Sequence, residues 1–298
     1  MTIEGWRPFM KKASHLVFIV GLAAALGLWA QEAPKTATQA IAPQPEPPKT
    51  AAELIAAGDE LFAKFDDAGA LAQYEQAAQL ESSNYEALWK TARAYMNVGD
   101  HVNYRAKDHE EQMLGHVLKA EQYLKKALAI NPNDSRTRFL NSAIIGRQGR
   151  EASRRKQVAL AKTVRVEIDK AIELDPDNDM AWHALAFWHK TLAEVGGAKR
   201  FFGGIIYGRI PKGSYDEAVK GFQKAIALNP GYCNHHLELA RTYVRLKKKD
   251  LAAKEYETGL ACPDRTSMCG RFKGRARREL ERLRAGEDPI RYRYGAGE

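Results

Sequence analysis

The sequence predicts an all-α protein built from repeated pairs of helices, and three observations support this prediction. A signature recurs along the chain: a small residue, a large apolar residue four positions later, and a second small residue three positions after that. In three copies a proline follows five positions after the second small residue, where it prevents the helix from continuing. No stretch alternates apolar and polar residues over a length that would indicate a β-strand.

Five copies of the signature divide the chain into five units of two helices each. Small residues let paired helices approach closely, and the larger residue fills the space left between them. The copies are Ala70, Tyr74 and Ala77; Ala120, Leu124 and Ala127; more loosely Val164, Ile168 and Ala171; Ala218, Phe222 and Ala225; and Ala252, Tyr256 and Gly259. We place the unit starts near residues 51, 85, 135, 179 and 233, followed by a closing helix over 265–285 and a tail over 287–298.

The units differ in length because three of them carry extra residues. In the second and third units apolar residues keep a spacing of three to four through the excess, which predicts lengthened second helices. In the fourth unit residues 196–213 contain six glycines, and this density predicts a loop or a broken hairpin rather than a helix. Phe201, Phe202 and Tyr207 on this segment could cap a binding surface or touch a membrane, and a plain packed turn is the alternative.

The N-terminal segment has the pattern of an export signal. Arg7, Lys11 and Lys12 precede an apolar stretch over residues 16–30 that ends at Ala30, as in secretory signals. We expect cleavage after Ala30 and a periplasmic or secreted protein. The alternative is an uncleaved anchor in the inner membrane, with the helical domain outside the cytoplasm. Residues 31–50 contain five prolines and are expected to form an extended linker.

The chain contains three cysteines, Cys233, Cys262 and Cys269. In an oxidising compartment two of them can form a disulfide. We expect Cys262 and Cys269 to be the pair, because they are close in sequence across a predicted loop. Cys233 is then left without a partner and is expected to have a structural role.

The sequence contains no recognisable catalytic or cofactor-binding arrangement. His109 begins a run that resembles a zinc-protease motif, but Met113 stands where the second histidine would be needed. The other histidines lack the spacing of metal ligands, so we predict no metal and no cofactor. The net charge of +9 suits an acidic partner or an anionic lipid surface. Nucleic acid is disfavoured by the interspersed acids and the predicted export.

The length of the first unit, 34 residues, and its small and aromatic positions resemble the tetratricopeptide repeat (TPR). In TPR arrays the first helix of each unit lines a concave face through positions 2, 5, 9, 12 and 13, and this resemblance implies a protein or peptide partner bound there. Arginine and aromatic residues, which anchor partners strongly, are frequent at these positions. The predicted groove residues are Trp89, Arg93, Asn97, Arg136, Phe139, Arg147, His183, Phe187, Lys190, Asn234, Arg241 and Arg245. The alternative is that they serve ordinary helix packing and solvation.

Residues 181–283 more narrowly resemble the TPR-like domain of the regulator of microtubule dynamics family. The resemblance rests on the segment AWHALAFWHKTLAEV, the insertion that follows it, and the segments SYDEAVKGFQKAIALNPGY and LELARTYVRLKKKDLAAKEYETGLACP. Members of this family are anchored helical-repeat proteins with tethering roles and, in one branch, phospholipid binding. The resemblance therefore implies an alternative function, in which the chain binds lipid in an apolar cavity or tethers membranes.

Overall fold

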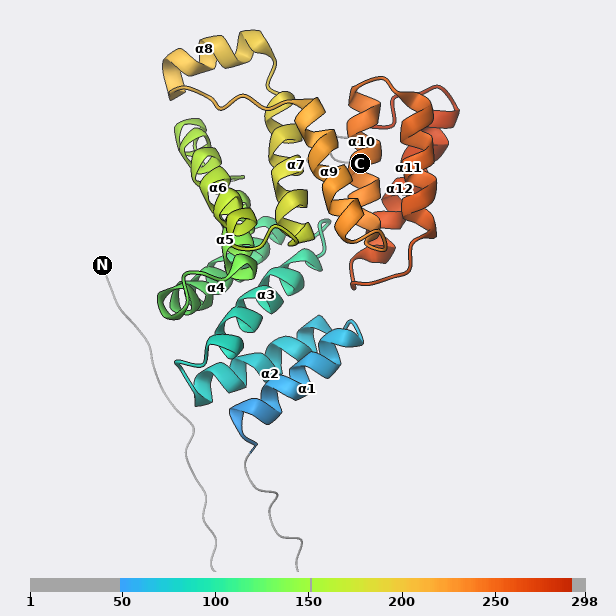
Figure 1. Ribbon diagram of the computed structural model, residues 1–298. Helices are drawn as coiled ribbons and strands as arrows, with labels where there is room; N and C mark the ends of the chain where they lie inside the picture. The colour runs from blue at the N-terminus through green and yellow to red at the C-terminus, as the bar shows by residue number, and fades with distance from the viewer. Residues whose placement is uncertain (1–48, 151, 291–298) are drawn as a thin grey trace, which may run out of the picture. The chain divides into compact units, whose positions relative to one another are not determined.

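The computed structural model describes residues 49–150 and 152–290, and this part of the chain contains twelve helices and no strand (Figure 1). The predicted all-α solenoid of TPR-type helix pairs is confirmed. The predicted signal and anchor over residues 1–30, most of the linker and most of the C-terminal tail lie outside the described residues.

Five helix pairs follow one another along the chain. The first helices of the pairs are α1 (Ala51–Ala63), α3 (Tyr85–Asp100), α5 (Ser135–Gln148), α7 (Asp179–Ala193) and α10 (Cys233–Arg245). The second helices are α2 (Asp67–Leu80), α4 (His109–Ile130), α6 (Arg154–Leu174), α9 (Tyr215–Leu228) and α11 (Lys249–Ala261). An inserted helix, α8 (Gly197–Tyr207), lies between α7 and α9, and α12 (Cys269–Arg284) packs on α10 and α11. With 22 and 21 residues, α4 and α6 are the longest second helices described.

Polar side chains start several helices at defined points. A side chain just before the helix accepts a hydrogen bond from a backbone N–H of the first turn, which would otherwise have no partner. At α1 the interaction is reciprocal, because the Glu53 side chain also accepts from the backbone N–H of Thr50. Caps of this kind are formed by Thr50, Asp66, Asn84, Asp134, Asn178 and Ser214.

The small residues of the repeated signature lie where the helices of a pair meet. Ala70, Ala120, Ala218 and Ala252 are completely buried. At Gly58 a Cβ atom would stand 2.5 Å from the ring of Tyr74, so only glycine lets α1 approach α2 over this tyrosine. The small residues of the signature therefore recur where two helices are in direct contact.

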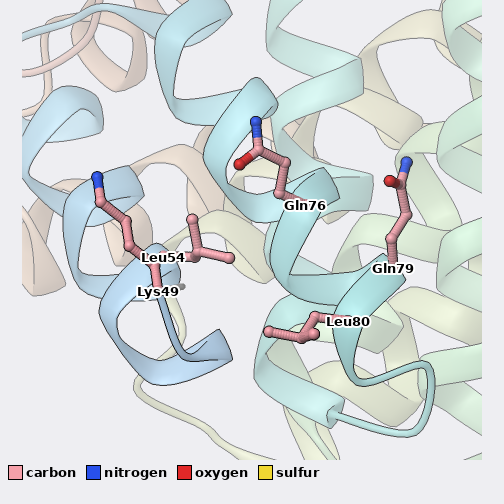
Figure 2. Close-up of a pocket in the computed structure, with 5 residues that line it drawn as sticks. All are labelled: Lys49, Leu54, Gln76, Gln79 and Leu80. Carbon is pink, nitrogen blue, oxygen red and sulfur yellow. The ribbon is translucent and has the colours of Figure 1, made fainter. Parts of the chain in front are cut away.

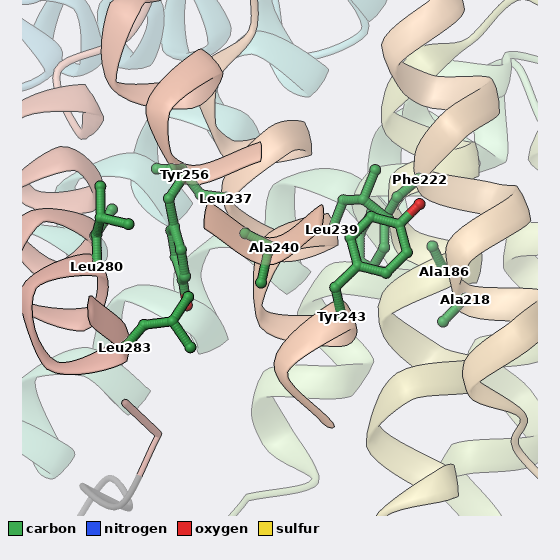
Figure 3. Close-up of a cluster of buried hydrophobic side chains, with 12 residues drawn as sticks. Ala186, Ala218, Phe222, Leu237, Leu239, Ala240, Tyr243, Tyr256, Leu280 and Leu283 are labelled. Carbon is green, nitrogen blue, oxygen red and sulfur yellow. The ribbon is translucent and has the colours of Figure 1, made fainter. Parts of the chain in front are cut away.

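The largest hydrophobic cluster of the described residues joins the last units to α12. Figure 3 shows Phe222 of α9, Leu237 and Tyr243 of α10, Tyr256 of α11 and Leu280 of α12 within this cluster. The described residues lie in one compact unit, and all the buried clusters found among them lie inside it. This unit thus has a core of its own and the properties of an independently folding domain.

The prediction of a loop or broken hairpin over residues 196–213 is wrong for residues 197–207, which form α8. Each glycine disfavours a helix by about 1 kcal/mol relative to alanine. Packing of α8 against α6 offsets this preference. The chain leaves the helix only at Gly208, whose φ of 93° is readily adopted by glycine alone.

In the described part of the chain, no helix is both long enough and apolar enough to cross a membrane.

Candidate functional site

The twelve predicted groove residues lie on four first helices, three on each of α3, α5, α7 and α10. The structure joins them into two groups that differ in chemistry. Residues on α3 and α5 meet around Trp89, whereas residues on α7 and α10 meet around Glu238.

Arginine and aromatic side chains alternate across the first three units. The guanidinium carbon of Arg93 lies 4.0 Å from the ring centre of Phe62 and 4.8 Å from that of Trp89. Arg136 of α5 approaches the same tryptophan at 4.6 Å. We call these four side chains the arginine–aromatic ladder. The indole N–H of Trp89 donates to Glu86 at 2.9 Å, which fixes the ring between the two arginines.

Arg93 makes no ion pair within the described residues. Its Nη2 donates one long hydrogen bond, 3.5 Å, to the hydroxyl of Tyr74, and its Nε has no hydrogen-bond partner among the described residues. Burial lowers the pKa of Arg93, because removal from water disfavours the charged form. A desolvated guanidinium without a carboxylate is suited to bind one from outside, since two parallel N–H groups match its two oxygens.

Arg136, at the other end of the ladder, is paired and about half-exposed. Its guanidinium contacts Asp134 at 2.6 Å and Glu86 at 3.6 Å, and its side chain is 53% exposed. Phe139 lies one turn further along α5 and is partly buried. The exposed end of the ladder therefore lies at α5.

Two predicted residues of the last units, Lys190 and Arg241, are buried and form ion pairs inside the protein. Arg241 is buried and donates from Nη1 to Glu238 at 2.5 Å and from Nε to Glu279 of α12 at 2.8 Å. Lys190 of α7 forms an ion pair with Glu238, and the Tyr256 hydroxyl donates to Glu279 at 3.1 Å. We call these five side chains the buried ionic network.

The charges of this network stabilise one another. Burial alone would raise the pKa of Glu238, but Lys190 and Arg241 hold it well below its usual range. For Arg241, burial would lower the pKa, and the carboxylates of Glu238 and Glu279 raise it instead. A partner could reach Lys190 or Arg241 only by breaking these pairs.

His183 and Asn234 lie beside the buried ionic network. His183 Nδ1 lies 2.9 Å from Nδ1 of His235, whose Nε2 lies 2.9 Å from Asp179. Burial of the ring, and next the neighbouring His235, lower the pKa of His183 to about 3. The side-chain oxygen of Asn234 is buried without a hydrogen-bond partner among the described residues.

Two more predicted residues remain accessible in the last units. Phe187 is 42% exposed, with the Lys190 ammonium 4.6 Å from its ring centre. Arg245 pairs with Glu194 at 3.3 Å. Among the described residues, neither of them contacts a side chain of the ladder.

The first two units contact the loop before α12 through a group of polar side chains, which we call the clasp. Asp67 accepts hydrogen bonds from Asn97 at 3.0 Å and from Ser267, and it lies 2.9 Å from His101. Arg271 of α12 donates to the backbone oxygen of Asp100 at 2.6 Å. Arg147 of α5 pairs with the Asp100 carboxylate at 2.5 Å. Asn97 and Arg147, both predicted groove residues, therefore have structural partners.

The clasp contains a serine, a histidine and an aspartate, but they are not arranged as a catalytic triad. A triad needs the serine at one imidazole nitrogen and the aspartate at the other. Here Nε2 of His101 lies within 3.0 Å of Ser267 and 2.9 Å of Asp67, so one nitrogen meets both. The aspartate therefore cannot orient the histidine as a base for this serine.

The three thiols form a buried cluster and are all free. The Sγ atoms of Cys233 and Cys269 lie 3.4 Å apart, a proximity that the sequence spacing did not indicate. The disulfide between Cys262 and Cys269 stays a prediction. No three metal-binding side chains within residues 49–150 and 152–290 are grouped so that they could hold an ion.

Two hollows are described, and none of the twelve predicted residues lines either one. The first, of about 520 Å³, lies between α1 and α2 and is lined by Leu54, Gln76 and Leu80 among others (Figure 2). The second, of about 720 Å³, lies between α6 and the α8 segment. Tyr207 of the predicted loop is 38% exposed at the end of α8, while the side chains of Phe201 and Phe202 lie outside the described residues.

Sequence reasoning missed Phe62, which completes the ladder. It stands at position 12 of the first unit, so the rule that selected the other residues would have found it there. Ser267 and Glu279 carry no such signal, because their contacts depend on how α12 packs.

Comparison with known proteins identifies the family. The sequence profile of "Regulator of microtubule dynamics protein 1-3" matches residues 54–284. The chain belongs to this family. It is 30% identical over 174 residues to regulator of microtubule dynamics protein 1 of Mus musculus, a match that covers 58% of this chain and 56% of the relative. The chain therefore spans about half the length of that relative. Regulator of microtubule dynamics protein 1 of Caenorhabditis elegans is 20% identical over 220 residues, a match that covers 74% of this chain and 95% of the relative.

Solved structures agree with the fold. A TPR protein of Thermus thermophilus, TTC0263, superposes with a TM-score of 0.56 at 18% identity, covering 76% of this chain and 98% of that one. A monomeric mutant of IFIT1 superposes with a TM-score of 0.51 at 15% identity, covering 80% of this chain and 56% of that one. At these identities the likeness concerns the fold alone. A fold of stacked helix pairs offers an extended surface for interaction with other proteins.

Proposed function

We propose that this chain is an exported, non-enzymatic scaffold that binds a protein or peptide partner through an acidic side chain placed against Arg93. The observation that carries the proposal is the state of this arginine: it is desolvated, it contacts the rings of Phe62 and Trp89, and it forms no direct ion pair with any described carboxylate. Burying a charge without a counter-charge is unfavourable. A carboxylate from a partner would supply that counter-charge.

The neighbours of Arg93 support a protein partner. Phe62 and Trp89 both contact the guanidinium of Arg93, so little side-chain freedom is lost when a carboxylate binds. Arg136 and Phe139 continue this surface towards α5, where Arg136 is exposed enough to meet a second acidic group. Aromatic residues and arginine are the types that carry most of the affinity in protein interfaces.

The proposed surface is smaller than the one predicted from the repeat positions. Lys190 and Arg241 have internal partners, so the surface is centred on the first three units rather than on units two to five. Phe187 and Arg245 are accessible but lie outside this surface. The proposal does not include nucleic acid, because the acidic Glu86 lies beside Arg136 and would repel a phosphate backbone.

Affinity capture tests the proposal directly. The domain of residues 48–298 is used as bait in an envelope extract, beside the variants Arg93→Glu and Arg278→Glu. Arg278 is an exposed arginine of α12 and serves as the matched control. We expect specific partners with the wild type and the control, and their loss with Arg93→Glu while its circular dichroism stays unchanged. Equal capture by both variants would show that Arg93 is not the binding centre.

Export is a separate part of the proposal and rests on the basic and apolar pattern of residues 7–30. The intact mass of the mature protein tests it. A chain that begins at Gln31 supports a cleaved signal, and a full-length chain in the membrane fraction supports the anchor. A full-length chain in the cytoplasmic fraction would contradict both.

A further inference from the structure

The segment after α7 forms a hairpin. One arm is helix α8, the other is the irregular segment that returns from it to α9, and glycines lie at the turn and at the close contacts. The chain runs out along α8, turns at Gly208 with a φ of 93° and returns through residues 209–214. A Cβ atom at Gly203 would stand 3.1 Å from Ile210 on the returning segment. A Cβ at Gly213 would collide with the backbone of His189 and Ala193 in α7. The first approach holds the returning segment against α8, and the second holds the end of that segment against α7.

The tip of the hairpin is apolar and faces solvent. Ile205 is 73% exposed, Ile206 is 60% exposed and Tyr207 is 38% exposed. Three consecutive large apolar residues are otherwise exposed nowhere in the described part of the chain. Such a patch marks an interaction site, because it leaves a contiguous apolar area in water.

Positive charge surrounds this tip. The hollow of about 720 Å³ between α6 and the hairpin is lined by Lys162, Arg200, Arg209 and Lys212, together with Ile205, Ile210, Pro211 and Gly204. Arg200 is occupied, since its Nη2 donates to the backbone oxygens of Leu192 and Val195 at 2.7 and 2.8 Å. The other three cations make no ion pair with any described residue, and no acidic side chain lines the hollow.

We propose that the α8 hairpin docks the domain on an anionic membrane surface. Ile205, Ile206 and Tyr207 enter the layer between headgroups and acyl chains, while Lys162, Arg209 and Lys212 meet lipid phosphates. A bilayer offers apolar material beneath a negatively charged layer, which is the order in which this hairpin presents apolar and basic groups. A protein partner would need an apolar pocket for the tip and, beside it, acidic groups for three cations. A bilayer offers both features over its whole surface, so we favour the bilayer.

This docking site is separate from the surface around Arg93. It is built by α6, α8 and the returning segment, whereas the ladder lies on α1, α3 and α5. Membrane docking and peptide binding therefore stand or fail independently. A tethered partner could be held by the ladder while the hairpin contacts lipid.

Cosedimentation with vesicles tests the proposal on the domain of residues 48–298, which excludes the apolar stretch over residues 16–30. Vesicles of phosphatidylcholine alone are compared with vesicles of equal parts phosphatidylcholine and phosphatidylserine. We expect binding to the anionic vesicles only, weakened by salt. Replacement of both isoleucines, Ile205→Asp with Ile206→Asp, is expected to weaken binding by about a hundredfold or more.

A second pair of variants tests the charge. Arg209→Glu with Lys212→Glu is expected to weaken binding at least about twentyfold, from about fivefold for each cation near an anionic surface. The matched controls are Lys249→Glu with Lys254→Glu for charge and Leu251→Asp for an exposed apolar residue, all on α11. Binding that is unchanged in the hairpin variants, equal binding to both vesicle types, or no binding to either would overturn the proposal.

Discussion

Arg93 and Arg241 occupy the same position, the ninth, in the second and fifth units, but their surroundings differ completely. Arg93 contacts two aromatic rings and forms no direct ion pair with any described carboxylate. Arg241 lies between two buried carboxylates, one of them supplied by α12. The comparison teaches that a repeat position fixes where a side chain lies, while the packing around it decides whether that side chain serves stability or binding.

The largest expected effect comes from removing the buried arginine. Arg241→Met leaves Glu238 and Glu279 without their main counter-charge, and we expect a loss of about 3–5 kcal/mol in the free energy of unfolding. Arg93→Met leaves no carboxylate unpaired and is expected to cost only about 1 kcal/mol in lost stacking. Urea unfolding of the two variants measures both values. Equal losses of unfolding free energy in the two variants would contradict the proposed difference between Arg241 and Arg93.

Acid should destabilise the last units through His183. Its pKa is lowered from 6.5 to about 3 in the folded protein, so between these values the unfolded chain takes up a proton that the folded chain does not. The free energy of unfolding therefore falls as pH falls below about 6.5, by up to about 1.4 kcal/mol per pH unit from this group. Denaturant unfolding between pH 7 and pH 4.5 tests this, above the range in which most carboxylates titrate.

The matched variants for this test are His183→Gln and His109→Gln. We expect His183→Gln to flatten the pH dependence, because the glutamine takes up no proton in either state. His109 lies at the start of α4 and is partly exposed, so its variant controls for the effect of a histidine-to-glutamine replacement elsewhere in the chain. An unchanged slope in His183→Gln would contradict the assignment of the acid sensitivity to this ring.

A smaller effect compares two tyrosines at one signature position. Tyr256 donates to Glu279 inside the buried ionic network at 3.1 Å, whereas Tyr74 donates to Asp59, which is partly exposed, at 2.7 Å. Tyr256→Phe leaves a buried carboxylate with one donor fewer and should cost about 2 kcal/mol, while Tyr74→Phe should cost about 1 kcal/mol. Thermal unfolding distinguishes them, and a reversed order would show that the network is more tolerant than its burial implies.

Much of the fold could be predicted because its determinants are local. The alanines that contact a neighbouring helix recur at fixed spacing, and asparagine or aspartate before a proline marks the end of each of three second helices. The helix at 197–207 could not be predicted, since glycine disfavours helices and its contacts with α6 and with the end of α7 come from tertiary packing.

The candidate site was predictable in position but not in chemistry. The repeat positions place Arg93, Lys190 and Arg241 on first helices, and the structure agrees. Their partners come from elsewhere: Glu279 lies 38 residues after Arg241, and Glu238 lies 48 residues after Lys190. A pattern of positions within each repeat carries no information on which arginine will meet a carboxylate from the closing helix.

The most direct test of the central claim is a peptide array probed with the domain of residues 48–298. Each peptide containing aspartate or glutamate is matched by the same peptide with asparagine or glutamine. We predict that the wild type prefers the acidic member of its bound pairs by about tenfold to a hundredfold, and that Arg93→Met loses this preference while Arg278→Met keeps it. A wild type without the preference, or an Arg93→Met variant that retains it, would contradict the account.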